Sequence, residues 1–221
     1  MGHPTPPLQP VHPLDFDKPI TVTRQQLPHW TQQHVTYFVN FRLADSVPAP
    51  LLRSWEEQRT IWLRVHGITY DSENQWRHKL QTLPEALRRE FRTRFTQTFE
   101  RMLDDGHGSC LLRNPESRNV VENALRYFHN ERYTLGRFVI MPNHVHALIC
   151  PQGEHALKDI LHSWKRFTAR KINEALGRKG ELWQSESYDH IVRDEAELQR
   201  IENYILQNPL KAGLQDGFTL G

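Results

Sequence analysis

Residues 132–150 read Arg-Tyr-Thr-Leu-Gly-Arg-Phe-Val-Ile-Met-Pro-Asn-His-Val-His-Ala-Leu-Ile-Cys, and this stretch decides the fold. Its two parts, 132–140 and 144–150, are largely apolar, and the short turn Met-Pro-Asn separates them. Short apolar runs bounded by turn residues are typical of buried strands. We therefore predict a β-hairpin whose register places the histidines of its second strand near the centre of a sheet.

Two of these histidines, His144 and His146, lie two residues apart in that second strand. Residues i and i+2 of a strand point to the same side, so the two imidazoles project together. Such a pair makes half of a divalent-metal site. A chain with 13 histidines in 221 residues contains about 0.7 such pairs by chance. By itself the pair therefore favours ordinary solvated or hydrogen-bonded histidines.

A second informative stretch begins at Asp194 and has the pattern of a helix. Asp194 can cap its start, and the acidic first turn suits the helix dipole. Leu198, Ile201 and Ile205 recur at helical spacing and would face the core. Pro209 is expected to end the helix and to bias the residue before it away from helical geometry.

Tyr204 and Asn208 are four residues apart in this helix, so they share one face. A tyrosine hydroxyl is a poor nucleophile unless it is activated, and a nearby cation can polarise the bond that it attacks. Asn208 offers a carbonyl oxygen as a third, neutral metal ligand. Tyr188 is a competing tyrosine, but only Tyr204 has a ligand-type partner one turn on. The plain alternative is that Tyr204 is a half-buried aromatic residue packed on the sheet.

The remaining patterns give the organisation of the chain. Residues 1–33 hold many prolines and no periodicity, which predicts a loose arm before a single domain at 34–221. We expect strands at 34–44, 132–140, 144–150 and 188–193. We expect helices at 51–65, at 156–176 and from 194 onward. A further helix should begin at a capping box at 82–85 and end at about 106, and another should follow an Asn-Pro-Glu cap at 114–116. This order predicts an α+β fold, an antiparallel sheet with helices packed on one face, of the ferredoxin-like kind, with 48–104 as an enlarged helical insertion.

Composition excludes several classes of protein. The net charge is only +2, and the two cysteines, Cys110 and Cys150, form neither a disulfide framework nor a zinc-finger pattern. No apolar run approaches the length of a membrane span, and the start of the chain lacks a signal-peptide pattern. We therefore expect a cytoplasmic protein with no membrane association.

The helix at 156–176 and the loop after it are basic. Between residues 156 and 180 stand seven basic residues: Lys158, Lys165, Arg166, Arg170, Lys171, Arg178 and Lys179. A face of this kind can neutralise the phosphates of DNA, although most basic helices are simply solvated. Unpaired bases would need aromatic platforms, for which Trp183 and Tyr188 are candidates, and Trp183 could equally be a core residue.

Several ordered motifs resemble the single-tyrosine HUH transposases, and most of all the branch of REP-associated tyrosine transposases. They are Met141-Pro142-Asn143-His144-Val145-His146, Trp183-Gln184, Tyr188-Asp189-His190-Ile191-Val192-Arg193 and Tyr204-Ile205-x-x-Asn208-Pro209-x-Lys211-Ala212-Gly213-Leu214. The resemblance covers about 106–214, with a weaker echo at 37–43.

This resemblance implies a function. In the family, the histidine pair and the polar residue one turn after the tyrosine bind a divalent metal, Mg²⁺ or Mn²⁺; here these are His144, His146 and Asn208. Tyr204 would attack single-stranded DNA and form a 5′-phosphotyrosine intermediate, which makes the chain a DNA nicking and joining enzyme. Hairpin-forming palindromic (REP) repeats would be the substrate. No small-molecule cofactor is implied, and either a monomer or a homodimer fits a bacterial, nucleoid-associated protein.

Two alternatives stay open on sequence alone. One is a hairpin-DNA-binding regulator that keeps the fold without cleaving; the intact His144, His146 and Tyr204 argue against it. The other is a metal-dependent hydrolase of small phosphoesters that uses water as its nucleophile, and such an enzyme would not need Tyr204.

Overall fold

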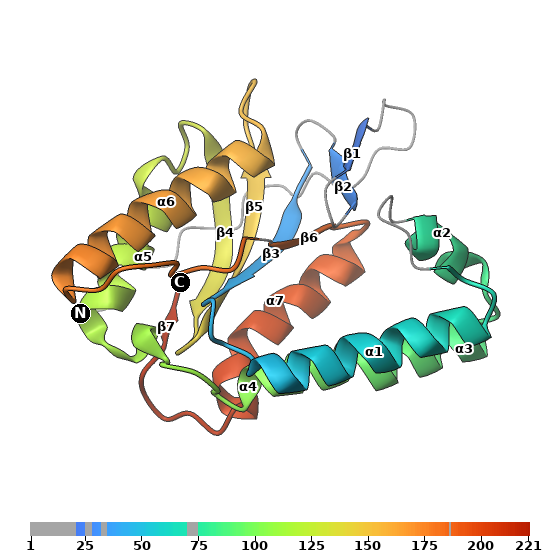
Figure 1. Cartoon of the computed structure of the whole chain (residues 1–221). Coiled ribbons are helices and arrows are strands. Elements are labelled where there is room, and N and C mark those ends of the chain that lie inside the picture. Colours follow the sequence, from blue (N-terminus) through green and yellow to red (C-terminus); the bar gives the residue numbers. More distant parts are fainter. Residues whose placement is uncertain (1–20, 25–27, 32–34, 70–74, 186) are drawn as a thin grey trace.

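The computed structural model of the chain describes residues 21–24, 28–31, 35–69, 75–185 and 187–221 (Figure 1). Its strands are β1 (Thr21–Arg24), β2 (Pro28–Thr31), β3 (Tyr37–Arg42), β4 (Tyr133–Ile140), β5 (His144–Pro151), β6 (Tyr188–Ile191) and β7 (Thr219–Leu220). Its helices are α1 (Ala49–Val65), α2 (Gln75–Thr82), α3 (Glu85–Phe91), the π-helical η1 (Arg92–Thr96), α4 (Gln97–Asp104), the 3₁₀ turn η2 (Leu111–Arg113), α5 (Pro115–Tyr127), α6 (Leu157–Ala175) and α7 (Glu195–Lys211). No helix among the described residues is both long and apolar enough to cross a membrane.

Five strands form one antiparallel sheet in the order β6-β3-β5-β4-β7, with β5 in the middle (Figure 1). In the register of β3 with β5, Arg42 lies opposite His144 and Asn40 lies opposite His146. The predicted hairpin is thus confirmed, and its histidines lie on the central strand. The α+β class, with an antiparallel sheet and helices packed on it, is confirmed as well.

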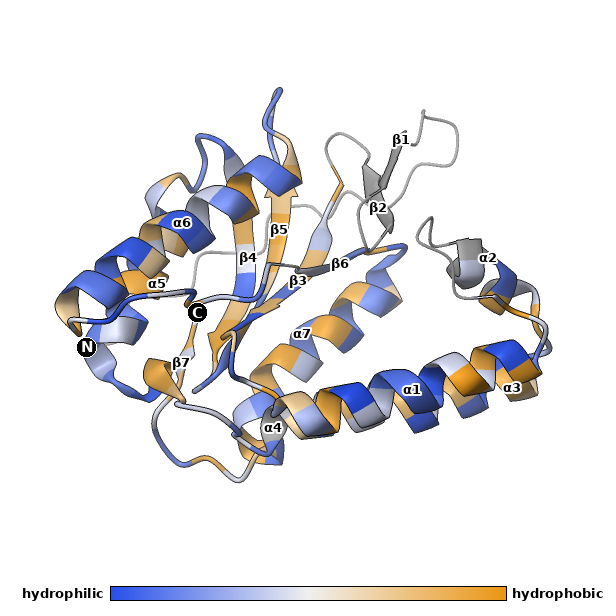
Figure 2. Cartoon of the chain, in the orientation of Figure 1, coloured by the Kyte–Doolittle hydropathy of each residue, from blue (hydrophilic) through white to orange (hydrophobic). Residues whose placement is uncertain are grey.

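Helices cover both faces of this sheet, so the expectation of helices on one face only is wrong. The α5 and α6 helices pack on the side of Val145, Ala147 and Ile149, whereas α7 packs on the side of Leu148. Figure 1 shows α6 and α7 on opposite sides of β3 and β5, and Figure 2 shows the apolar colouring of β5 between them. The physical reason is that both faces of the sheet carry buried apolar residues, such as Val145 on one side and Val139 and Leu148 on the other, and each apolar face requires a cover.

The insertion between β3 and α5 contains the predicted helices together with α2, which the sequence pattern did not indicate. Its aromatic residues form a small core apart from the sheet, in which Phe91 and Phe95 pack against Trp62 of α1. Thr82 is not the predicted helix cap, because it is the last residue of α2, where its hydroxyl donates to the carbonyl of Lys79. The proline after it leads into α3 without a side-chain cap.

Two corrections concern the ends of the chain. The arm predicted to lack regular structure contains an antiparallel strand pair, β1 with β2, because Thr21, Val22 and Thr23 are β-branched residues that favour strands; residues 1–20 lie outside the described part. Asp194 caps α7 as predicted, since its carboxylate accepts from the amide of Glu197. The helix does not end at Pro209 but runs to Lys211.

Candidate metal-assisted tyrosine site

His144 and His146 lie side by side on the α7 face of β5, and both are buried. Their ring centroids are 4.7 Å apart, with the ring planes nearly perpendicular. The Nδ1 atom of His144 is 2.7 Å from Oδ1 of Asn143, and the amide of Asn143 donates in turn to the carbonyl of His107. This chain of contacts orients His144 so that Nε2 is the ring nitrogen left to bind a metal.

His146 faces the tyrosine. The hydroxyl of Tyr204 lies 3.4 Å from Nε2 of His146, and the two ring centroids are 5.1 Å apart. Phe38 of β3 stacks on the imidazole of His146 at 5.4 Å and meets the ring of Tyr204 edge-on at 6.0 Å. Phe38 therefore holds the histidine and the tyrosine in a fixed relation to each other. The Nζ atom of Lys211 lies 5.6 Å from the centre of the Tyr204 ring.

Asn208 lies one turn of α7 after Tyr204 and is fully buried. The Oδ1 and Nδ2 atoms of Asn208, Nε2 of His144 and Nδ1 of His146 are buried without a hydrogen bond of good geometry. Such groups are costly in a folded protein, so a cluster of them suggests a ligand. The sequence pattern predicted this convergence of β5 and α7, and the structure brings all four side chains together.

The electrostatics of the site keep both histidines neutral. Burial lowers the pKa of His144 to about 3, helped by the positive charge of Arg42 and partly opposed by the nearby Asn208 side chain. Burial also lowers the pKa of His146 well below its usual value, and the neighbouring His144 adds to this. A neutral imidazole is the form that binds a metal, so these histidines need not lose a proton first.

The donor set fits a divalent cation that binds weakly to the protein alone. The site offers two imidazole nitrogens, from His144 and His146, and one amide oxygen, from Asn208, and this set suits Mn²⁺. Mg²⁺ is also compatible, because it usually takes few protein ligands beside the phosphate of a substrate. Within the described ranges, no three His, Cys, Asp or Glu side chains gather as a closed structural site would require.

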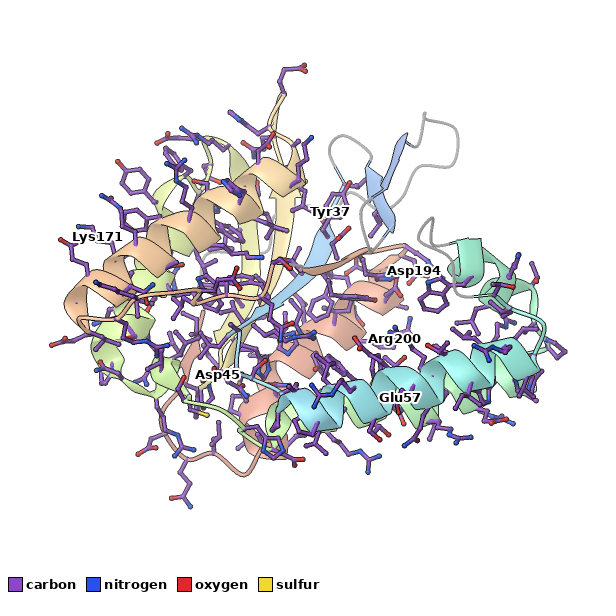
Figure 3. The ribbon with its side chains drawn as sticks, viewed as in Figure 1. Tyr37, Asp45, Glu57, Lys171, Asp194 and Arg200 are labelled. Atoms are coloured by element: carbon purple, nitrogen blue, oxygen red, sulfur yellow. The ribbon has the colours of Figure 1, made fainter. Side chains whose placement is uncertain are left out.

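The predicted DNA-binding cations lie elsewhere. Lys158, Arg166, Arg170 and Lys171 are exposed on α6, which covers the face of the sheet opposite the histidines; Figure 3 shows Lys171 on the outer side of α6. Lys165 is half-buried, and its Nζ donates to the carbonyl of Ser185 at 2.7 Å. These five residues therefore do not join the histidine pair, and their contact with DNA stays a prediction.

The alternative left open for Trp183 is the correct one, because its side chain belongs to the core. It is only 5% exposed, its Nε1 donates to Thr168 at 2.8 Å, and it meets Phe41 edge-on. It is therefore no platform for bases. Tyr188 is 42% exposed and lies edge-on to Phe38, on the same face of the sheet as the histidines, so it remains the candidate platform.

Sequence reasoning missed one charged residue of the site, Arg42 at the end of β3. It lies opposite His144, its Nε donates to Oε1 of Gln184 at 2.6 Å, and its guanidinium stacks on the ring of Phe99 at 4.4 Å. In the sequence of β3 the odd-numbered residues Tyr37, Val39 and Phe41 are apolar, which already indicated that Arg42 points to the other face of the strand. Which strand lies beside Arg42 was not readable from that alternation.

Comparison with protein families gives one match, and it covers the segment that holds the site. The family model described as "Transposase IS200 like" matches residues 111–208, a range that holds the histidine pair, Tyr204 and Asn208. Over this range the chain is similar to the IS200-like transposases, which supports the family that the motifs indicate. No curated protein sequence matches the chain.

Two solved structures are similar to the chain at low identity. One is a REP-associated tyrosine transposase bound to a REP hairpin, with 15% identity, 84% of this chain and 72% of that chain covered, and a TM-score of 0.43. The other is a putative transposase from Deinococcus radiodurans R1, with 14% identity, 80% and 93% covered, and a TM-score of 0.35.

Proposed function

We propose that this transposase-family protein is a metal-dependent single-stranded DNA endonuclease and strand transferase that acts through a 5′-phosphotyrosine intermediate. The observation that carries the proposal is the approach of the Tyr204 hydroxyl to within 3.4 Å of His146, beside His144 and Asn208. A buried imidazole pair, a neighbouring amide and a tyrosine hydroxyl are the parts that such chemistry needs.

Each residue has a defined role in the proposed reaction. His144, His146 and Asn208 would hold Mg²⁺ or Mn²⁺, which when bound polarises the scissile phosphate and offsets its growing charge. The Tyr204 oxygen attacks phosphorus, the bond to the 3′ oxygen breaks, and the DNA 5′ end stays on the tyrosine. The phenol loses a proton and the leaving 3′ oxygen gains one. Attack by a 3′-OH on the phosphotyrosine reverses these steps and joins strands without an external energy source.

The proposed substrate is single-stranded DNA beside a hairpin formed by a palindromic repeat, which is the substrate class that the motif resemblance implies. All four site residues come from one chain, so a monomer carries a complete site and we propose that it is the active form. The exposed Tyr188, on the same face of the sheet, offers a surface on which an unpaired base can stack.

A covalent-trapping experiment tests the proposal. The protein is incubated with hairpin DNA labelled at the 5′ or the 3′ end, with Mg²⁺, Mn²⁺ or a chelator, and the products are separated on a denaturing gel. We expect a metal-dependent adduct that carries the 3′ label only and that disappears in Tyr204→Phe. The matched control is Tyr188→Phe, which should retain the adduct.

The other outcomes identify the alternatives. Hairpin binding without any adduct, across metals and palindromes, would replace the enzyme with a DNA-binding regulator. Metal-dependent hydrolysis of small phosphoesters that persists in Tyr204→Phe would instead indicate a hydrolase that uses water as its nucleophile.

A further inference from the structure

We infer that Lys211 binds the phosphate group that Tyr204 attacks. The inference rests on the proposed function, since it concerns the DNA substrate of the same site. Lys211 is the last residue of α7, and it lies three residues after Asn208 and seven after Tyr204. Residues three or four apart are neighbours on the surface of a helix, so the tyrosine, the amide and the lysine form one row along α7.

The row depends on the continuation of α7 past its proline. Pro209 lies inside the helix, and the backbone stays helical for two more residues, to Lys211. If the helix ended at Pro209, Lys211 would belong to the following segment and would have no fixed place on the face of Tyr204. The observed end of α7 therefore sets the point from which the lysine side chain starts.

The ammonium group of Lys211 lies over the ring of the proposed nucleophile. Its Nζ atom is 5.6 Å from the centre of the Tyr204 ring, a distance at which a cation is attracted to the face of an aromatic ring. The ring itself is held in place, because Phe38 meets it edge-on at 6.0 Å and the imidazole of His146 lies at 5.1 Å. Although Lys211 is exposed, its charged end is thus turned toward the reacting residue.

No neighbouring side chain on α7 neutralises this charge. The residues three and four positions before Lys211 carry amides, and those three and four positions after it are a leucine and a glutamine. Within the part of the chain that the structure describes, its ammonium group forms no ion pair with a carboxylate. A cation held beside the proposed nucleophile attracts an anionic ligand, and a phosphate oxygen is a strong acceptor for its N–H groups.

The proposed reaction gives the charge of Lys211 a purpose. As the Tyr204 oxygen bonds to phosphorus, negative charge increases on the non-bridging oxygens of the phosphate. The same phosphate becomes attached to the ring over which the ammonium group lies. Lysine presents three N–H donors at the end of a flexible stem, so it can stay bound to the phosphate from the intact strand to the phosphotyrosine. Lys211 remains protonated throughout and takes no proton from the phenol.

Binding without chemistry tests the phosphate contact. The parent protein for this test is Tyr204→Phe, which keeps the ring beneath the ammonium group. Its affinity for a fluorescent DNA hairpin with a single-stranded flank is measured by anisotropy over a range of salt concentrations. We expect Lys211→Gln to weaken binding by about threefold to tenfold and to reduce the magnitude of the slope of log K against log salt by about 0.7. Lys211→Arg should retain the slope, because the charge is kept.

The matched control is Lys79→Gln, which removes an exposed lysine of the helical insertion and should leave affinity and slope unchanged. Lys211 also lies in the last turn of α7, where a cation favours the helix dipole. If this were its whole role, Lys211→Gln would lower Tm without changing the salt slope. Thermal melts of all variants therefore accompany the binding measurements.

A scan of single methylphosphonates along the flank locates the contact. Each methylphosphonate removes the charge of one phosphate. The parent protein should lose affinity at the phosphate position that is cleaved when Tyr204 is intact. Lys211→Gln should lose less affinity than the parent at that position, because the partner charge is already absent.

The rate of adduct formation gives a readout with chemistry. In protein that retains Tyr204, at saturating DNA and metal, Lys211→Gln should slow adduct formation by about tenfold, and Lys211→Arg should recover most of the rate. The inference is overturned if Lys211→Gln matches Lys79→Gln in salt slope and methylphosphonate response while unmodified protein still forms the adduct. If no adduct forms but the effects of Lys211 on binding persist, the cleavage proposal fails and the phosphate contact stands. A parent protein that binds no hairpin at low salt would overturn both.

Discussion

The hydroxyl of Tyr204 lies 3.4 Å from Nε2 of His146, although 58 residues separate them in the chain. The contact exists because α7 is docked on the sheet by apolar residues on either side of the tyrosine, Leu198 and Ile205, which pack with Leu148 of β5. The histidine thus comes from the rigid centre of the sheet, and the tyrosine comes from a helix whose position depends on packing. The geometry of the site is set by the docking of α7.

Metal binding should appear as thermal stabilisation in the absence of DNA. A ligand at a hundred times its Kd stabilises the folded state by about 2.7 kcal/mol, which for a chain of this size raises Tm by about 5–10 °C. We expect this rise with Mn²⁺, its reversal by a chelator and its loss in His144→Ala combined with His146→Ala. The matched control is His155→Ala at an exposed position, and an equal loss there would show that the metal binds elsewhere.

Stability should fall in mild acid because of the buried histidines. The pKa of His144 is about 3 in the folded chain against an ordinary value of 6.5, so the unfolded state binds the extra proton first. The stability from this group is therefore complete above about pH 6.5 and is lost as the pH falls toward about 3. At about pH 5 the loss is about 2 kcal/mol, and His146 acts in the same direction.

Urea denaturation at about pH 8 and about pH 5 measures this loss. In His144→Gln the difference between the two free energies of unfolding should shrink by about 2 kcal/mol. The exposed His162 provides the control variant His162→Gln, which should keep the full difference. An unchanged difference in His144→Gln would show that His144 is protonated in the folded chain.

The parts of the site that were predicted from sequence depend on local periodicity. The alternation of β5 places His144 and His146 on one side, and the helical repeat places Tyr204 and Asn208 on one face; both patterns are complete within a few residues. Arg42 is different, because its place beside His144 depends on the pairing of β3 with β5. That pairing joins segments about a hundred residues apart, and a pattern within one strand does not specify it.

Packing also explains where prediction was wrong. Pro209 disfavours helical geometry in the residue before it, yet α7 continues to Lys211 because Ala212 and Leu214 beyond it pack on the cluster beneath the helix. Trp183 is equally compatible with a base platform and with a core position until its neighbours are known. The side of the sheet that α6 covers also depends on tertiary packing. The basic residues of α6 could therefore be predicted from sequence, but their place on the face opposite the histidines could not.

The helical insertion should unfold separately from the sheet. Phe95 is 1% exposed and belongs to the cluster of Trp62 and Phe91, which is distinct from the cores on the sheet. Phe95→Ala should destabilise this unit by about 3–5 kcal/mol. By hydrogen exchange we expect lost protection in α1 and α3, with β4 and β5 still protected. The exposed Phe167→Ala on α6 is the control, and equal loss in the sheet would mean that the chain unfolds as one unit.

The buried side chain of Asn208 should lower the free energy of unfolding when no metal is bound. Its amide is fully buried, and neither polar atom has a hydrogen bond of good geometry. Replacement by an apolar side chain of similar size removes that penalty, so Asn208→Leu should raise the free energy of unfolding by about 1 kcal/mol without metal. The same variant should reduce the rise in Tm with Mn²⁺, because a ligand is lost. Urea denaturation and thermal melts measure both effects, with the exposed Gln207→Leu as control. A fall in the free energy of unfolding in Asn208→Leu would show instead that the amide makes a stabilising contact within the protein. The buried amide would then no longer be an argument for a bound metal.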